Sequence, residues 1–152
     1  MCTIRMVSPE QLRRYPCFSG VSEESLRKLA MMTEEKSFSV GDHLCREGEL
    51  VEHLFIIVDG EVDIQLVLGS GELAPVDILV AGDLVMWSAV VRPYRARFSS
   101  VARTDVTALA IEAVTLRELM HKDHELGFGL MLGIATALAH RLAGARVQLA
   151  AR

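Results

Sequence analysis

The sequence predicts a mainly β fold with flanking helices: a double-stranded β-helix, or jelly roll, followed by a long C-terminal dimerisation helix. Three observations support this prediction. Short strand-like runs between residues 36 and 111 are separated by glycine turns, helical periodicity flanks them on both sides, and the last helical segment is apolar around most of its circumference. Several short strands with glycine turns between them are typical of a roll rather than of a parallel sheet.

Composition and charge indicate one domain and disfavour nucleic acid and membranes as partners. The 152 residues, 51% of them hydrophobic, are enough for a single core. We expect N-terminal helices in residues 1–35, the roll in 36–111 and C-terminal helices in 112–152. The net charge of −4 disfavours direct binding of nucleic acid. An apolar signal segment is missing, and the charge-free run 126–139 is shorter than the roughly 20 residues of a membrane span, so we expect a cytoplasmic protein that does not bind membranes.

Two short helices are predicted in the first 35 residues. Ser8 has the position of an N-cap, with Gln11 three residues later. Ser22 is the N-cap of the second helix, and Val21 with Leu26 has the spacing of a hydrophobic staple.

The clearest strand signal is the stretch "LFIIVDGEVDIQL", residues 54–66. An apolar run ends at Asp59-Gly60, and polar and apolar residues alternate after it. An Asp-Gly pair between two strands favours a two-residue type I′ turn, so we expect a hairpin at this point. Further chain breaks are expected at Gly41, Gly48, Gly69 with Gly71, and Gly82.

The C-terminal part of the chain predicts two helices, "EAVTLRELM" at residues 112–120 and a longer one capped by Asp123. Apolar residues recur every fourth position along the longer helix, at Leu126, Leu130, Ile134, Leu138 and Leu142. A helix that is apolar on nearly all faces must be covered on more than one side. Monomers seldom expose large apolar patches, and we therefore expect a homodimer through this helix. The alternative is that the helix closes the core of a monomer.

Motifs for metals, haem or catalysis are missing from the sequence. The five histidines show no H-x-x-H spacing on one helix face, because His121 and His124, which are three apart, lie on either side of the Asp123 cap. Cys2, Cys17 and Cys45 form no C-x-x-C pair. A serine nucleophile elbow and a Walker loop are missing as well. We therefore expect a protein that is not an enzyme and holds no metal, and a redox or haem sensor is the least favoured hypothesis.

Four stretches carry a resemblance to a known family: "YPCFSGVSEESLRKLA" at residues 15–30, "VGDHLCREGE" at 40–49, "LFIIVDGEVDI" at 54–64, and the Gly82-Asp83 pair. In this order they resemble the cyclic nucleotide-binding domain of the Crp/Fnr family, over essentially the whole chain. The resemblance implies a β-roll that holds a small anionic ligand and a final helix that pairs two subunits. In the family's transcription factors a helix-turn-helix domain follows, and we expect a stand-alone member without it.

The phosphate-binding cassette departs from the family pattern. Where nucleotide-binding members carry Gly-Glu, with the glutamate accepting from a ribose hydroxyl, this chain has Met86 and Trp87. An indole only donates, so the resemblance implies that the sugar end of the site is lost. The phosphate-pairing arginine of the family corresponds to Arg97 when counted from Gly82 and to Arg95 when counted back from the next strand, and both assignments stay open.

The remaining candidates come from the same cassette and from the long helix. Ser88 and Tyr94 belong to a "WSxxxxPYR" pattern, residues 87–95, that looks like a subgroup of stand-alone members, and Ser99 and Ser100 offer hydroxyl donors. The base-contacting hydroxyls of the family correspond to Ala145 and Arg146. The candidate ligand-binding residues are thus Gly82, Met86, Trp87, Ser88, Tyr94, Arg95, Arg97, Ser99, Ser100 and Arg146.

Two functional hypotheses follow. The first is a small-molecule sensor that acts through a homodimer on an unknown protein partner, with a cyclic nucleotide such as cyclic AMP or another small anion as ligand. The second is a ligand-free interaction and dimerisation module in which Met86 and Trp87 plug the pocket.

Overall fold

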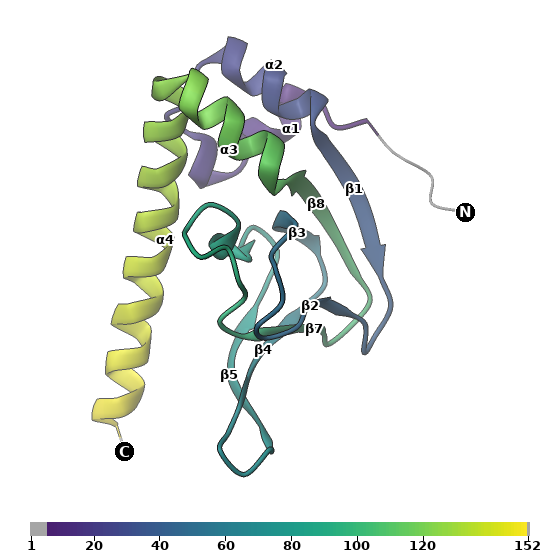
Figure 1. Cartoon of the computed structure of the whole chain (residues 1–152), viewed down its shortest axis with the longest axis vertical. Coiled ribbons are helices and arrows are strands. Elements are labelled where there is room, and N and C mark those ends of the chain that lie inside the picture. Colours follow the sequence, from purple (N-terminus) through teal and green to yellow (C-terminus); the bar gives the residue numbers. More distant parts are fainter. Residues whose placement is uncertain (1–5, 152) are drawn as a thin grey trace.

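Two four-stranded antiparallel sheets form the body of the molecule in the computed structural model, which describes residues 6–151 (Figure 1). The strands are β1 (Thr33–Phe38), β2 (His43–Cys45), β3 (His53–Asp59), β4 (Val62–Val67), β5 (Leu73–Leu79), β6 (Leu84–Val85), β7 (Ser99–Ala102) and β8 (Val106–Glu112). One sheet has the order β1-β8-β3-β6 and the other the order β2-β7-β4-β5. The predicted roll is confirmed, although its first strand begins at Thr33, three residues before the expected boundary.

Helices flank the roll at both ends of the chain. Before the roll come α1 (Pro9–Arg13), the 3₁₀ turn η1 (Pro16–Phe18) and α2 (Glu23–Met31), and after it come α3 (Ala113–Lys122) and α4 (His124–Ala150). A further 3₁₀ turn, η2 (Trp87–Ala89), lies within the roll between β6 and β7. The three predicted N-caps are confirmed. Ser8 Oγ accepts from the N–H of Gln11, Ser22 Oγ from that of Ser25, and Asp123 Oδ1 from that of Leu126, at 3.2, 3.2 and 3.1 Å. Cys2 and Arg152 lie outside the described residues.

The hairpin predicted at Asp59-Gly60 is wrong. β3 pairs with β6 and β8, whereas β4 pairs with β5 and β7, so the two strands lie in different sheets. The chain turns a corner here rather than folding back on itself. Gly60 has φ 96°, and a Cβ at this position would lie 2.2 Å from the carbonyl oxygen of Asp105. Glycine is therefore required because another backbone segment passes close to it. The hairpin of this region is β4–β5, where Val67 pairs with Leu73 across the predicted glycine break.

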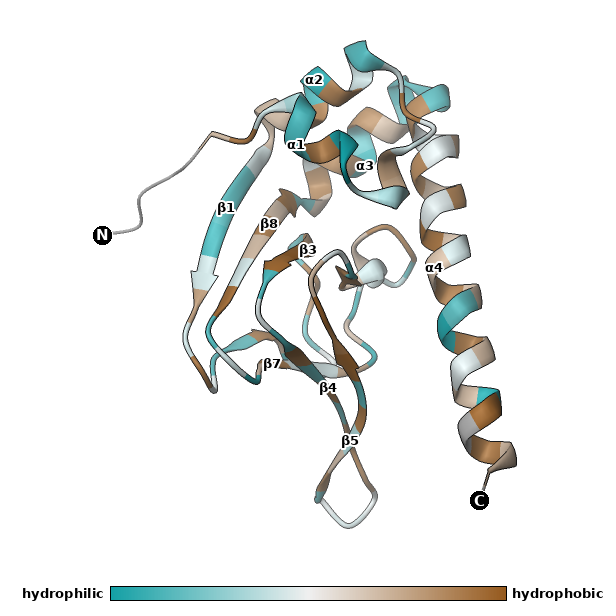
Figure 2. Ribbon diagram, turned by 180° about the vertical axis from the view of Figure 1, so that it is seen from behind, coloured by the Kyte–Doolittle hydropathy of each residue, from teal (hydrophilic) through white to brown (hydrophobic). Residues whose placement is uncertain are grey.

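One hydrophobic core joins the roll to the helices. Its fully buried side chains come from α1 and η1 (Leu12, Phe18), α2 (Leu26, Leu29), β3 (Leu54, Ile56, Ile57), β8 (Leu109, Ile111), α3 (Leu116) and α4 (Leu126, Leu130). Figure 2 shows α4 running along one side of the molecule beside the roll, with apolar and hydrophilic residues along its length. From His124 to Val147 this helix is long and apolar enough to cross a bilayer by length and composition alone, as core helices of soluble proteins also are.

Candidate functional site

Backbone hydrogen bonds fix the start of the cassette on β3. The N–H of Gly82 donates to the carbonyl of Ile57 at 2.7 Å, and the N–H of Ile57 donates to the carbonyl of Asp83 at 3.0 Å. The carboxylate of Asp83 accepts from the N–H of Val80 at 2.8 Å. The loop between β6 and β7 therefore starts from a rigid position.

Met86 has a left-handed backbone conformation, with φ 70° and ψ 50°. A left-handed residue other than glycine costs roughly 1–2 kcal/mol, whereas glycine adopts the conformation freely. The backbone thus retains the geometry suited to the glycine of the family pattern, although methionine stands in its place. The Met86 side chain is buried, and its sulfur accepts a hydrogen bond from Ser100 Oγ at 3.7 Å.

A cavity of about 490 Å³ lies between the cassette, the β4–β5 hairpin and the C-terminal half of α4. Met86 and Trp87 line it from the cassette side. Most of the other walls are apolar and include Ile64, Leu79, Phe98, Leu138 and Leu142. The charged side chains among the lining residues are Asp77 and Arg141. This cavity, named the α4 cavity below, suits a ligand with an apolar or planar body.

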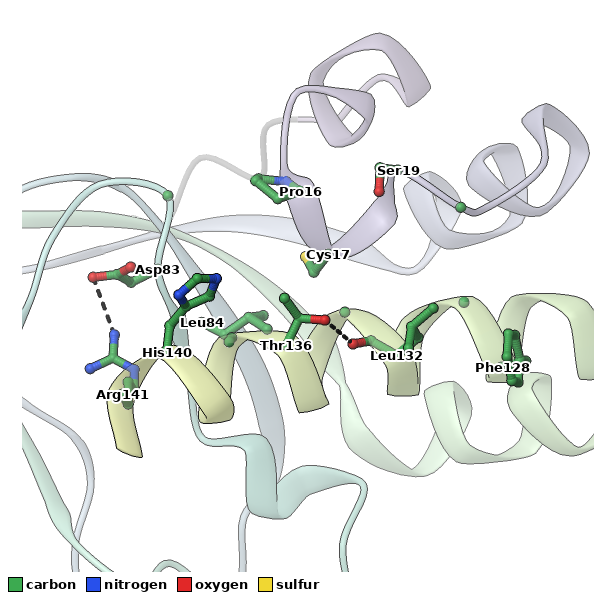
Figure 3. A pocket seen from close by; sticks show the side chains of 15 residues that line it. Pro16, Cys17, Ser19, Asp83, Leu84, Phe128, Leu132, Thr136, His140 and Arg141 are labelled. Atoms are coloured by element: carbon green, nitrogen blue, oxygen red, sulfur yellow. Dashed lines mark hydrogen bonds and ion pairs between the residues drawn. The ribbon is translucent and has the colours of Figure 1, made fainter. Parts of the chain in front are cut away.

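Arg141 supplies the only positive charge in the described lining of the α4 cavity. Its Nη1 contacts Asp77 of β5, and its Nη2 lies 3.3 Å from the carboxylate of Asp83 at the start of the cassette (Figure 3). Its side chain is 31% exposed. One guanidinium therefore connects α4, the hairpin and the cassette. Sequence reasoning missed this residue, although Arg141 is the first Lys, Arg, Asp or Glu after Glu125 along an apolar helix.

The two arginines predicted for phosphate pairing lie outside the α4 cavity. Arg95 and Arg97 are both exposed, and Arg95 Nη1 donates to the carbonyl of Gly48 at 3.0 Å. Ala96, between them, is 4% exposed. The inward-facing position of this segment is therefore an alanine, and both neighbouring arginines point outward.

The predicted serines are buried in the cassette and in β7. Ser99 Oγ accepts from the N–H of Glu47 at 3.0 Å, while Ser100 Oγ is directed to the sulfur of Met86. Ser88 is buried within η2. Two of the three hydroxyls are thus engaged in contacts within the protein.

The remaining predicted residues lie apart from one another. Gly82 lines a groove between η1 and α4, which Figure 3 shows from close by. Tyr94 lines a different cavity, next to α3. Arg146 is exposed on α4, where its neighbour Ala145 lines the α4 cavity. Of the ten predicted residues, the α4 cavity brings together Met86 and Trp87.

The cysteines of the described chain are buried, free thiols. Burial raises the pKa of Cys17 to about 12, and burial also raises the pKa of Cys45. A thiol with a raised pKa stays protonated and is a poor nucleophile or metal ligand. Within residues 6–151 no three His, Cys, Asp or Glu side chains are grouped so that they could hold a metal ion.

Comparisons with known proteins agree with the fold. The sequence pattern of the cyclic nucleotide-binding domain matches residues 35–123, more than half of the chain. Curated protein sequences yield no significant match. A crystal structure of a protein assigned as cyclic nucleotide-binding, from Geobacter metallireducens GS-15, is 31% identical with a TM-score of 0.83, over 90% of this chain and 99% of that one.

Two further solved structures are similar. The regulatory subunit of a cAMP-independent protein kinase A from Trypanosoma brucei is 25% identical, with a TM-score of 0.67, over 72% of this chain and 40% of that one. The catabolite activator protein of Thermus thermophilus is 21% identical, with a TM-score of 0.70, over 88% of this chain and 61% of that one. With the roll, the cassette and the long helix in place, the chain belongs to the cyclic nucleotide-binding domain family.

Proposed function

We propose that this chain is a regulatory domain that senses a small molecule in the α4 cavity and acts through a homodimer on a protein partner. The observation that carries the proposal is the position of the cavity. It lies where the cassette, the β4–β5 hairpin and α4 meet, and Arg141 connects all three. A ligand bound there contacts every element that would have to move.

The walls of the α4 cavity suggest the chemistry of the ligand. Apolar side chains accommodate a ring or hydrocarbon body, and the guanidinium of Arg141 suits a carboxylate or phosphate because it can donate two parallel hydrogen bonds. Arg141 would thus take the role that the family resemblance assigned to Arg95 or Arg97. Cyclic AMP has a planar base and a phosphate, yet Trp87 offers its ribose no acceptor. We expect a ligand whose recognition does not depend on a sugar.

The switching mechanism follows from the partners of Arg141. An anion that engages the guanidinium competes with Asp77 and Asp83, which join it to the hairpin and the cassette. Weakening these two contacts changes how the C-terminal half of α4 is held against the roll. A ligand shifts the two arrangements only by the difference between its affinities for them.

The exposed side of α4 supports the homodimer. Large apolar side chains on this helix that are more than half exposed include Phe128, Leu132, Leu142, Val147 and Leu149. A second copy of the same helix would cover them in a two-fold arrangement. Sedimentation velocity tests this part of the proposal: we expect a dimer that Leu132→Glu converts to a monomer. A native chain that sediments as a monomer at tens of micromolar would contradict it.

Calorimetry and fluorescence test the ligand. The native chain is titrated with cyclic AMP, cyclic GMP, cyclic di-GMP and anilinonaphthalene sulfonate, an anionic aromatic probe, while the emission of Trp87, the single tryptophan, is recorded. We expect saturable binding of the sulfonate, weakened about tenfold in Arg141→Gln, as is typical of a lost charge-assisted hydrogen bond. Arg14→Gln, which removes an exposed charge elsewhere, is the matched control.

A ligand-free interaction module is the second candidate. The buried Met86 side chain favours it, because it occupies space that glycine leaves open in the family pattern. No heat with any of the four compounds and unchanged Trp87 emission would favour this candidate over the sensor.

A further inference from the structure

A second cavity, of about 550 Å³, lies on the side of the cassette loop that faces α3 and the start of α4. Its lining includes the nitrogen-bearing side chains of Arg92, Arg117, His121 and His124. The lining contains no Asp or Glu, although the chain has 20 acidic residues against 16 basic ones. Positive charge is therefore concentrated here in a protein that is negative overall.

Arg117 is held in place by the cassette loop. Its Nη1 donates to the carbonyl of Ala89 at 2.6 Å, and its guanidinium carbon lies 3.9 Å from the centre of the Tyr94 ring. Tyr94 has a left-handed backbone, with φ 63°, which places its ring under the guanidinium at a cost in strain. An arginine fixed by a carbonyl and an aromatic ring is preorganised for a ligand.

Neither arginine of this cavity is neutralised by the described protein. The ion pairs found among residues 6–151 use Arg13, Arg27, Arg46, Arg103 and Arg141. Arg92 and Arg117 take part in none of them. A guanidinium with an unused pair of parallel donors suits a carboxylate or phosphate.

Apolar side chains form the rest of the cavity. Val90 lies on the cassette side, Met120 on α3, and Phe128 and Met131 on α4. These groups can bury an apolar or aromatic body, with methionine adapting to its shape. The lining thus combines a charged part with an apolar one.

We propose that this second cavity binds a small organic anion, a carboxylate or phosphate on an apolar body, with Arg92 and Arg117 contacting the charged group. The site is separate from the α4 cavity, and the inference does not depend on the proposed function. The two sites share η2. This turn begins at Trp87, which lines the α4 cavity, and ends at Ala89, which accepts the hydrogen bond from Arg117. An anion bound to Arg117 therefore contacts a side chain that is hydrogen-bonded to the end of η2.

Phenyl phosphate is the probe, titrated by calorimetry into the full chain with Trp87 emission as a second readout. We expect a saturable site that is weakened about tenfold or more in both Arg92→Gln and Arg117→Gln and is retained in Arg141→Gln and in the control Arg14→Gln. Benzoate tests a carboxylate in place of the phosphate. Inorganic phosphate tests the apolar walls, and we expect it to bind at least about tenfold more weakly than phenyl phosphate.

Three results would overturn the inference. The first is no saturable binding of phenyl phosphate or benzoate at millimolar concentration. The second is unchanged affinity in Arg92→Gln, whose exposed side chain can be replaced without disturbing the fold even if Arg117→Gln unfolds. The third is loss of phenyl phosphate binding in Arg141→Gln with retention in Arg92→Gln, which would place the probe in the α4 cavity.

Discussion

The two halves of α4 differ in what holds them. In the N-terminal half Leu126, Leu130 and Ile134 are at most 2% exposed, and Gly133 lies directly against η1, where a Cβ would come within 2.7 Å of the backbone of Cys17. In the C-terminal half none of the described apolar side chains is buried: Leu138 is partly buried and Leu142 is 61% exposed. The ion pairs of Arg141 with Asp77 and Asp83 are the main polar connection of this half to the roll within the described chain.

This difference indicates that one helix serves two purposes. The first half is part of the core and should open only when the whole domain unfolds, whereas the second half is held by exposed contacts and can open locally. Mutations that are chemically alike should therefore have different effects at the two ends.

The largest difference is expected between two leucine truncations. Leu130→Ala removes a fully buried side chain and should lower the free energy of unfolding by about 2–5 kcal/mol. Leu142→Ala, at an exposed position, should change it by about 0.5 kcal/mol or less in the monomer. Urea denaturation at low protein concentration measures both. Equal losses would contradict the division of the helix.

Two glycine substitutions should have opposite signs. Gly133→Ala places a methyl group 2.7 Å from the Cα and carbonyl oxygen of Cys17, and should cost about 1–3 kcal/mol because backbone atoms must shift. Gly144→Ala meets no atom within 4 Å, and should stabilise the helix by up to about 1 kcal/mol through its better helix propensity. Thermal unfolding followed by circular dichroism distinguishes them, and destabilisation by both would be inconsistent with an open C-terminal half.

The Asp123 cap should make the stability of the N-terminal half of α4 depend on pH. Hydrogen bonds from the Ser25 hydroxyl and from the N–H of Leu126 hold the pKa of Asp123 below its usual value. A lowered pKa in the folded state means that this stabilisation is present above about pH 4 and is lost as the pH falls through the folded pKa.

Replacing the cap tests that dependence. Asp123→Ala should cost about 1–2 kcal/mol at neutral pH. Asp123→Asn keeps a capping oxygen and should reduce the loss of stability on acidification below about pH 4. Melting temperatures measured across that range decide the matter, and an unchanged acid profile in the asparagine variant would show that other carboxylates dominate.

The smallest effect on global stability is expected at Arg141. A partly exposed ion pair contributes up to about 1 kcal/mol, so Arg141→Gln should barely move the unfolding midpoint. Amide hydrogen exchange should nevertheless accelerate in residues 138–150 and stay unchanged in residues 124–134. Arg146→Gln, the same change on an exposed side chain of the same helix, is the control. Uniform acceleration along α4 would mean that Arg141 is not a local tether.

Local interactions made much of the fold predictable. The caps at Ser8, Ser22 and Asp123 depend on residues three positions apart, and each is present. The turn at Asp59-Gly60 was not predictable in the same way. The residues of a turn predict that the chain bends. They do not predict which sheet β4 joins, because that depends on its pairing with β7, some forty residues later.

The candidate site was predictable only in part, for a similar reason. Met86 and Trp87 follow the Gly-Asp pair at a fixed interval, and both line the α4 cavity. Sequence spacing could not tell which residues of this loop point inward. Ala96 does, and Arg95 and Arg97 on either side of it point outward. Arg141 has its partner Asp77 64 positions away, beyond the reach of spacing rules.

The left-handed turn at Met86 also affects how related chains should be searched for ligands. The backbone here follows a path that glycine would adopt without strain, and it is stabilised by its surroundings rather than by the residue that occupies it. The backbone conformation of the cassette is therefore kept although its side chains differ from the family pattern. Relatives without the glycine–glutamate signature should accordingly be screened against libraries of diverse acids rather than dismissed as empty scaffolds.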